Sequence, residues 1–204
     1  MKKKVIIAIL VGFTLAGAFA QQEPRIRQLD ELIRSGEVSI SATGNGASSG
    51  LALTGTIKNN TSGAVYINSN TNGLFMRNNN GQAQNMLVTS VYFRNTGYYA
   101  AYNSRFILVK PNELIEVIYQ AYCLNMDRDS PQANETLTFE SMPRELSDIA
   151  AKITRFIAAY PNQDNRKAVQ VFLWLQQGHN DQDIARYFVF SPIDREKADL
   201  IAMY

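Results

Sequence analysis

The chain has 204 residues and a formal net charge of +2, from 20 Lys and Arg against 18 Asp and Glu. This length suits one domain with its own hydrophobic core and is short for two ordinary domains joined by a linker. The near-neutral balance lacks the basic field that binding to a phosphate backbone requires, so nucleic acid is excluded as an expected partner.

The first twenty residues have the three parts of a secretory signal peptide. Three lysines follow Met1, residues 5–15 are apolar, and an Ala-Phe-Ala triplet ends at Ala20. The apolar stretch is shorter than the roughly 20 residues of a membrane span, and no later stretch is apolar enough to be one. We therefore expect cleavage after Ala20 and a single secreted or periplasmic domain of the cell envelope over residues 21–204, with no membrane insertion and no cysteine-linked lipid anchor.

A short helix and a series of strands are predicted for the first part of the mature chain. Residues 21–36 place apolar side chains at helical spacing and end at Gly36, which predicts a short amphipathic helix. Alternating apolar and polar residues over 51–67 predict a hairpin with one buried face. The Asn-rich segment Asn68–Asn85 predicts a long loop with one small strand.

Further strands lead to the only cysteine of the chain, Cys123. Alternation resumes over residues 86–93, and a turn around Pro111 separates two apolar runs, the second of which ends at Tyr122 and Cys123. Short strands joined by turns rich in Gly and Asn are typical of a β-sandwich. The β-rich part, residues 37–124, therefore predicts an N-terminal antiparallel β-sandwich.

Helical patterns dominate residues 142–204, after a polar segment over 125–138 that is expected to be irregular. Residues 142–160 carry one apolar face between two prolines. Residues 165–178 predict a helix that is apolar on nearly every side except at Gln170, which is typical of a buried helix. Two short helical pieces complete an α+β fold, a β-sandwich followed by a helical part.

Cys123 is unusual because an exported protein with one cysteine has no internal disulfide. It is a buried inert thiol, half of an intermolecular disulfide, a catalytic nucleophile or a partner in another internal bond. A nucleophilic cysteine normally needs a histidine base. His179, the only histidine, lies just past a predicted helix end, where a solvated side chain is the common arrangement. We expect no enzymatic activity.

A short acidic stretch after Cys123 imitates the start of a calcium-binding loop, with Asn125, Asp127 and Asp129 in the first three ligand positions. Ser130 stands where such a loop requires glycine, and Thr136 stands where it requires the closing glutamate. A solvated turn is the expected structure. No metal site and no cofactor are predicted.

Gln170 is the polar exception in an apolar run from Ala168 to Leu175. A buried carboxamide without partners is costly, so hydrogen bonds to the backbone are one explanation for it. The other explanation pairs it with Cys123, whose sulfur displaces ammonia from the carboxamide in a dry site and forms an internal thioester. Tyr122 and Trp174 are then expected to keep water away from the acyl group.

At these residues the chain resembles the thioester domains of secreted bacterial surface adhesins. Tyr122-Cys123-Leu124 matches an aromatic-Cys motif at a strand end, and the stretch from Val169 to Trp174 matches a Thr-Gln-x-x-apolar-Trp motif on a helix, with Val169 in place of threonine. The resemblance covers the C-terminal half best. It implies adhesion by covalent capture, in which an amine of a host or neighbouring-cell protein, or of another ligand, attacks the Gln170 carbonyl and releases the Cys123 thiolate.

Two functions without covalent chemistry remain open. The Asn-rich segment and the tyrosines at positions 92, 98, 99 and 102 offer rigid contact area and adaptable hydrogen bonds for carbohydrate or protein. The same tyrosines also fit as ordinary strand and edge residues. A structural or assembly role in the cell envelope, with no thioester, is the other interpretation.

Overall fold

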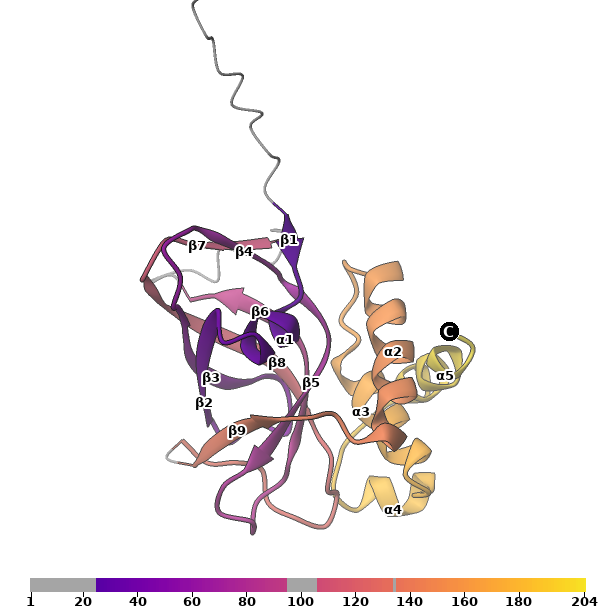
Figure 1. Ribbon diagram of the computed structural model, residues 1–204. Coiled ribbons are helices and arrows are strands. Elements are labelled where there is room, and N and C mark those ends of the chain that lie inside the picture. The colour runs from indigo at the N-terminus through magenta and orange to yellow at the C-terminus, as the bar shows by residue number, and fades with distance from the viewer. Residues whose placement is uncertain (1–24, 95–105, 134) are drawn as a thin grey trace, which may run out of the picture.

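The computed structural model describes residues 25–94, 106–133 and 135–204 (Figure 1). A β-rich region comes first and helices follow, so the predicted α+β order is confirmed. The predicted signal peptide and three of the tyrosines, Tyr98, Tyr99 and Tyr102, lie outside the described residues. Within those residues, no helix combines the length and apolar character that crossing a membrane requires.

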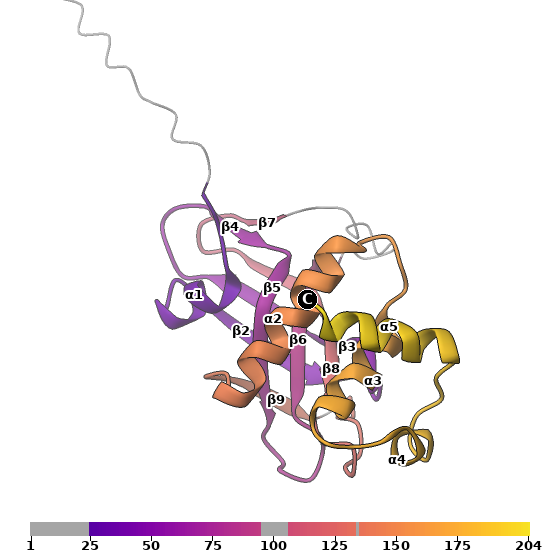
Figure 2. The ribbon, with the colours of Figure 1, turned by 90° about the vertical axis from the view of Figure 1, so that its right-hand side faces the viewer.

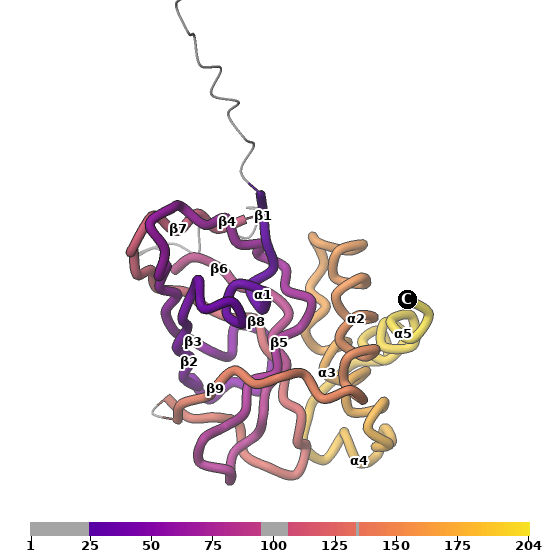
Figure 3. The backbone as a smooth tube through the Cα atoms, in the orientation of Figure 1, coloured from indigo at the N-terminus to yellow at the C-terminus, as the bar shows by residue number. Residues whose placement is uncertain are grey.

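Six of the described strands close into an antiparallel barrel in the order β2-β3-β8-β6-β5-β9, whose path the tube in Figure 3 follows. A separate sheet has the order β1-β4-β7, with β1 parallel to β4. The barrel strands are β2 (Val38–Gly44), β3 (Ser49–Asn59), β5 (Asn70–Asn78), β6 (Met86–Phe93), β8 (Leu114–Cys123) and β9 (Thr136–Glu140). The small sheet is made of β1 (Ile26–Arg27), β4 (Val65–Asn68) and β7 (Phe106–Val109).

The predicted β-sandwich is wrong, because the main strands form one closed barrel. The strand responsible is β9, whose Leu137 pairs with Ala42 of β2 on one side and with Asn78 of β5 on the other. This strand lies at the end of the segment that was expected to be irregular. Register shifts in β3 and β6 add local bends of the kind that help a sheet curl.

The Asn-rich segment Asn68–Asn85 is more regular than the predicted long loop with one small strand. It contains the nine-residue strand β5, which pairs with β6 and with β9. Leu74 and Met76 of this strand are fully buried. The side chain of Asn78, at its end, accepts a hydrogen bond from the main-chain N–H of Asn80 at 2.8 Å. Asparagine here ends a strand by bonding to nearby backbone, which is a local role.

The helices follow the predicted periodicity, apart from the first. The helix expected over residues 21–36 is the shorter α1, and β1 precedes it. In the second helix, Ala150, Ile153 and Phe156 are buried on one face, as its spacing predicts. The helices are α1 (Leu29–Arg34), α2 (Arg144–Ala159), α3 (Arg166–Gln176), α4 (Asp181–Ala185) and α5 (Pro192–Ala202).

The helices α2 to α5 gather on one side of the barrel (Figure 1), and the view turned by 90° shows them in front of the strands (Figure 2). α2 contacts β5 and β6, α3 contacts β3 and β8, and α5 packs against α3. Helix α3 therefore lies between the barrel and α5. This position explains why every residue from Ala168 to Trp174 is buried.

Close approach of two barrel strands depends on Gly55 of β3. A Cβ atom at this position would lie 1.9 Å from the main-chain oxygen of Ser41 in β2. Because paired backbone has little room to move, Gly55→Ala should lower the free energy of unfolding by about 3 kcal/mol, as measured by urea denaturation. Gly63→Ala is the matched control, since a Cβ there meets nothing within 4 Å. Equal losses in the two variants would contradict this account.

Candidate functional site

The structure brings Cys123, the last residue of β8, into contact with Gln170 in α3. Both residues are fully buried. The Gln170 carboxamide lies along the Cys123 main chain: its Oε1 accepts from the Cys123 N–H at 3.0 Å, and its Nε2 donates to the Cys123 carbonyl oxygen at 2.8 Å. The Cys123 N–H also donates to the carbonyl oxygen of Ser48 at 3.0 Å. The end of β8 therefore supplies hydrogen-bond partners for the Gln170 carboxamide of the buried helix α3.

The Cys123 thiol has a different set of neighbours. Its Sγ lies 3.5 Å from Sδ of Met86 and 4.0 Å from Oγ of Ser130. Among the described residues, no hydrogen bond joins the thiol to the Gln170 carboxamide. Burial raises the pKa of the thiol from 9.0 to about 12, an effect that the Ser130 hydroxyl only partly opposes. The thiol is therefore protonated at neutral pH.

The two residues expected to exclude water, Tyr122 and Trp174, are buried close by in the chain. Tyr122 precedes Cys123, and its hydroxyl accepts from Nε2 of Gln120 at 2.7 Å. Burial raises the pKa of Tyr122 well above its ordinary 10.0. Trp174 follows Gln170 by about one helical turn. Its ring meets that of Phe188 edge-on, with the centroids 5.6 Å apart. Both side chains are buried, and they contact Gln120 and Phe188 respectively.

The segment after Cys123 is tied to the loop before β6. Oδ1 of Asn125 accepts from the main-chain N–H of Asn85 at 3.0 Å, and Nε2 of Gln84 donates to the carbonyl oxygen of Arg128 at 2.6 Å. The side-chain oxygen of Asn125 is thus engaged inside the protein. Within the described residues, no cluster of three or more His, Cys, Asp or Glu side chains is placed to hold a metal ion.

His179 lies away from the Cys123 contact. It follows Gln170 by nine positions and lies beyond the end of α3 at Gln176. Its main-chain N–H donates to the carbonyl oxygen of Trp174 at 3.2 Å, and its side chain lines a surface hollow together with Asp181 and Arg195. The geometry therefore does not support a Cys/His catalytic pair.

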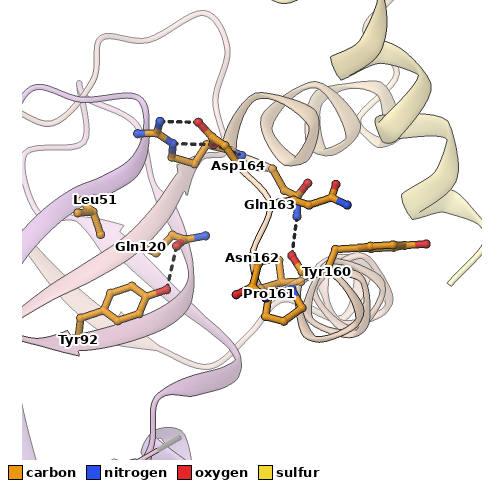
Figure 4. Close-up of a pocket in the computed structure, with 11 residues that line it drawn as sticks. Leu51, Tyr92, Gln120, Tyr160, Pro161, Asn162, Gln163 and Asp164 are labelled. Carbon is orange, nitrogen blue, oxygen red and sulfur yellow. Dashed lines mark hydrogen bonds and ion pairs between the residues drawn. The ribbon is translucent and has the colours of Figure 1, made fainter. Parts of the chain in front are cut away.

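A cavity of about 440 Å³, which the sequence did not predict, lies between the barrel and the helices (Figure 4). The barrel contributes Leu51, Tyr92 and Gln120, and the loop between α2 and α3 forms the opposite wall. The Tyr92 hydroxyl donates to Oε1 of Gln120 at 3.0 Å, and Gln120 in turn donates to Tyr122. This chain of hydrogen bonds joins the cavity wall to the residue before Cys123. The available signal in the sequence was the polar run after Pro161, between two predicted helices.

No protein-family model, no curated protein and no solved structure matches this chain.

Proposed function

We propose that the protein captures an amine-bearing target covalently through an internal thioester between Cys123 and Gln170. The observation that carries this proposal is the pairing of the Gln170 carboxamide with the Cys123 main chain in a fully buried site. Two residues 47 positions apart in the chain are held so that an electrophilic carbon lies beside the residue that bears the thiol.

Bond formation requires the Cys123 side chain to turn about its Cα–Cβ bond, from Met86 toward the carboxamide carbon. Sγ then bonds to Cδ of Gln170, the bond from Cδ to Nε2 breaks, and the thiol proton leaves with the nitrogen as ammonia. The Cys123 N–H already donates to Oε1, the oxygen on which negative charge develops in the tetrahedral intermediate. A donor aimed at that oxygen stabilises the intermediate.

Capture reverses the roles of the groups. An amine of the target attacks the Gln170 acyl carbon, an amide forms, and the amine proton passes to the Cys123 sulfur as the thioester breaks. One protein molecule captures one target, so the protein acts as an attachment reagent for a host or neighbouring-cell molecule, without turnover. Because both residues are fully buried, the resting bond is shielded from hydrolysis.

The intact mass of the purified mature protein tests the proposal. We expect a mass below the calculated value by one ammonia, and a gain of one methylamine after treatment with that reagent. After treatment, one thiol per chain should react with a thiol reagent in denaturant. The full calculated mass, in freshly prepared folded protein, would show that the thioester does not form.

The pKa of the thiol predicts a pH dependence of stability in methylamine-treated protein, whose Cys123 is free. The folded thiol holds its proton up to about pH 12, whereas the unfolded chain loses it near the ordinary value of 9.0. The buried neutral thiol therefore makes its full contribution to the free energy of unfolding below about pH 9, and this contribution is lost as the pH rises toward 12. Urea unfolding from about pH 8 to about pH 11 should show a steeper loss of stability than in Cys123→Ala. Parallel profiles would contradict the burial of a neutral thiol.

A second function, a non-covalent binding or structural module of the cell envelope, is favoured by the contacts of the thiol itself. Sγ packs against Met86 and Ser130, and backbone hydrogen bonds alone account for Gln170. The variant Cys123→Ala separates the two functions. It removes covalent capture and leaves non-covalent binding of a partner largely unchanged.

A further inference from the structure

Three Asn-Gly dipeptides occur in the chain, at Asn45-Gly46, Asn72-Gly73 and Asn80-Gly81. In such a dipeptide the main-chain nitrogen of the glycine can attack the carboxamide of the asparagine, because glycine lacks the Cβ atom that would hinder ring closure. The three glycines share a positive φ, of 87°, 96° and 72°. Differences in reactivity among the three sites therefore depend on the hydrogen bonds and the space around each of them.

Hydrogen bonds hold the attacking nitrogen at two of the three sites. The N–H of Gly46 donates to the carbonyl oxygen of Pro131 at 2.9 Å. The N–H of Gly73 donates to Oγ1 of Thr71 at 3.2 Å. Attack requires the nitrogen to lose its proton, and a hydrogen-bonded N–H is protected from that loss, as it is in amide hydrogen exchange. In the part of the chain that the structure describes, the N–H of Gly81 donates to no group.

Space for a cyclic intermediate also separates the sites. A Cβ atom at Gly73 would lie 2.8 Å from the Cβ of Ala150, so this dipeptide lies against α2. At Gly81 such an atom would meet nothing within 4 Å. Asn80 and Gly81 are both exposed, and the nearby Arg128 donates to the carbonyl oxygen of Gly81 at 3.0 Å, which leaves the nitrogen accessible. Asn80 is therefore the site at which ring closure is least opposed.

Asn80 follows β5 at one end of the seam where this strand pairs with β9 (Figure 1). Its Nδ2 donates to Oε1 of Glu135, the residue directly before β9, at 2.9 Å. In the next rung, the N–H of Asn79 donates to the carbonyl oxygen of Thr136 at 3.1 Å. Hydrogen bonds from the Gln132 main chain and, second, from the Asn80 carboxamide lower the pKa of Glu135. The carboxamide thus stabilises a carboxylate beside the closing strand.

We propose that Asn80 is a site of spontaneous deamidation, with water as the co-reactant, and that the product loosens the end of the seam between β5 and β9. The Gly81 nitrogen loses its proton to hydroxide and bonds to Cγ of Asn80. The bond from Cγ to Nδ2 breaks, and Nδ2 leaves as ammonia with a proton from water. Water then opens the succinimide ring and leaves aspartate or isoaspartate at position 80. The new carboxylate has no proton to donate to Glu135, and the two negative charges repel each other.

Peptide mass mapping of the folded mature protein, incubated in mildly alkaline buffer, measures the reaction at each asparagine. The peptide that contains Asn80 should gain one mass unit and separate into two products by chromatography. Conversion at Asn45 and at Asn72 should be roughly tenfold slower, a ratio that one hydrogen bond supports. In protein unfolded by urea the three sites should react at similar rates, because the unfolded chain lacks the hydrogen bonds that distinguish them.

The variant Asn80→Asp tests the consequence for the seam. It should speed hydrogen exchange at the Asn79 N–H, followed by NMR, by about threefold, because facing like charges destabilise paired strands. The double variant Asn80→Asp/Glu135→Gln should restore the wild-type rate, since it removes the repulsion. The matched control is Asn162→Asp, which adds a negative charge at an exposed position outside the seam and should leave the exchange rate unchanged.

Two results would overturn the proposal. No conversion of Asn80, or equal conversion of the three asparagines in the folded protein, would remove the modification site. An unchanged exchange rate in Asn80→Asp would remove its effect on the seam. Neither experiment involves Cys123 or Gln170, so the outcome is separate from that of the thioester.

Discussion

Cys123→Ala and Gln170→Ala should each abolish covalent labelling of the protein by a fluorescent primary amine. Wild-type protein is expected to incorporate one label per chain, detected after denaturing electrophoresis and located at Gln170 by peptide mass analysis. The loss should be complete in both variants, because one lacks the leaving group and the other lacks the acyl carbon. In the folded protein the Gln170 carboxamide contacts the main chain of Cys123 at this buried site.

A matched control is Gln84→Ala, which removes another buried glutamine. The Gln84 carboxamide bridges backbone in a similar way, accepting from the N–H of Asn125 at 3.1 Å and donating to the carbonyl oxygen of Arg128. The control should retain one label per chain. If Cys123→Ala were still labelled, the amine would be attached without a thioester, and the proposed mechanism would be wrong.

Trp174→Ala should lower the free energy of unfolding by about 4 kcal/mol. The indole is almost fully buried in α3 and packs edge-on against Phe188, so truncation leaves a cavity between the central helix and the segment that covers it. Urea denaturation followed by circular dichroism measures the change. Trp174→Phe should lose less, because it keeps a ring in contact with Phe188.

Tyr187→Ala serves as the comparison for Trp174→Ala. Tyr187 is 62% exposed, so its truncation should change the free energy of unfolding by no more than about 0.5 kcal/mol. A loss in Trp174→Ala as small as that in Tyr187→Ala would mean that the helical part does not depend on this packing.

Local patterns were sufficient for the class of the fold and for its main helices. The apolar spacing of residues 142–160 predicted the buried face of α2, and the nearly all-round apolar character around Gln170 predicted a buried α3. The pairing of Gln170 with Cys123 was suggested by their chemistry. The single cysteine had no disulfide partner, and the buried carboxamide had no evident hydrogen-bond partner in the sequence. The orientation of the thiol toward Met86 had no signal in the sequence, because it depends on a loop and a strand far apart in the chain.

Pairing between distant strands was not predictable from such patterns. β9 is only five residues long and follows a polar segment, so its own sequence does not identify it as a barrel strand. It closes the barrel by pairing with both β2 and β5. The cavity escaped prediction for the same reason. Its polar loop after Pro161 resembles an ordinary helix connection until Tyr92 and Gln120 are brought opposite to it.

Closure of the barrel by β9 has a consequence for the order of folding. Ala42 pairs with Leu137, which lies 95 positions later (137 minus 42), so the last seam joins only when most of the chain is available. Contacts between such distant segments slow folding. Until then β2 and β5 each present an open edge, and open edges recruit strands from other molecules. The unfinished barrel is therefore the species most prone to aggregate, and this risk lasts until residues 136–140 join β2 to β5.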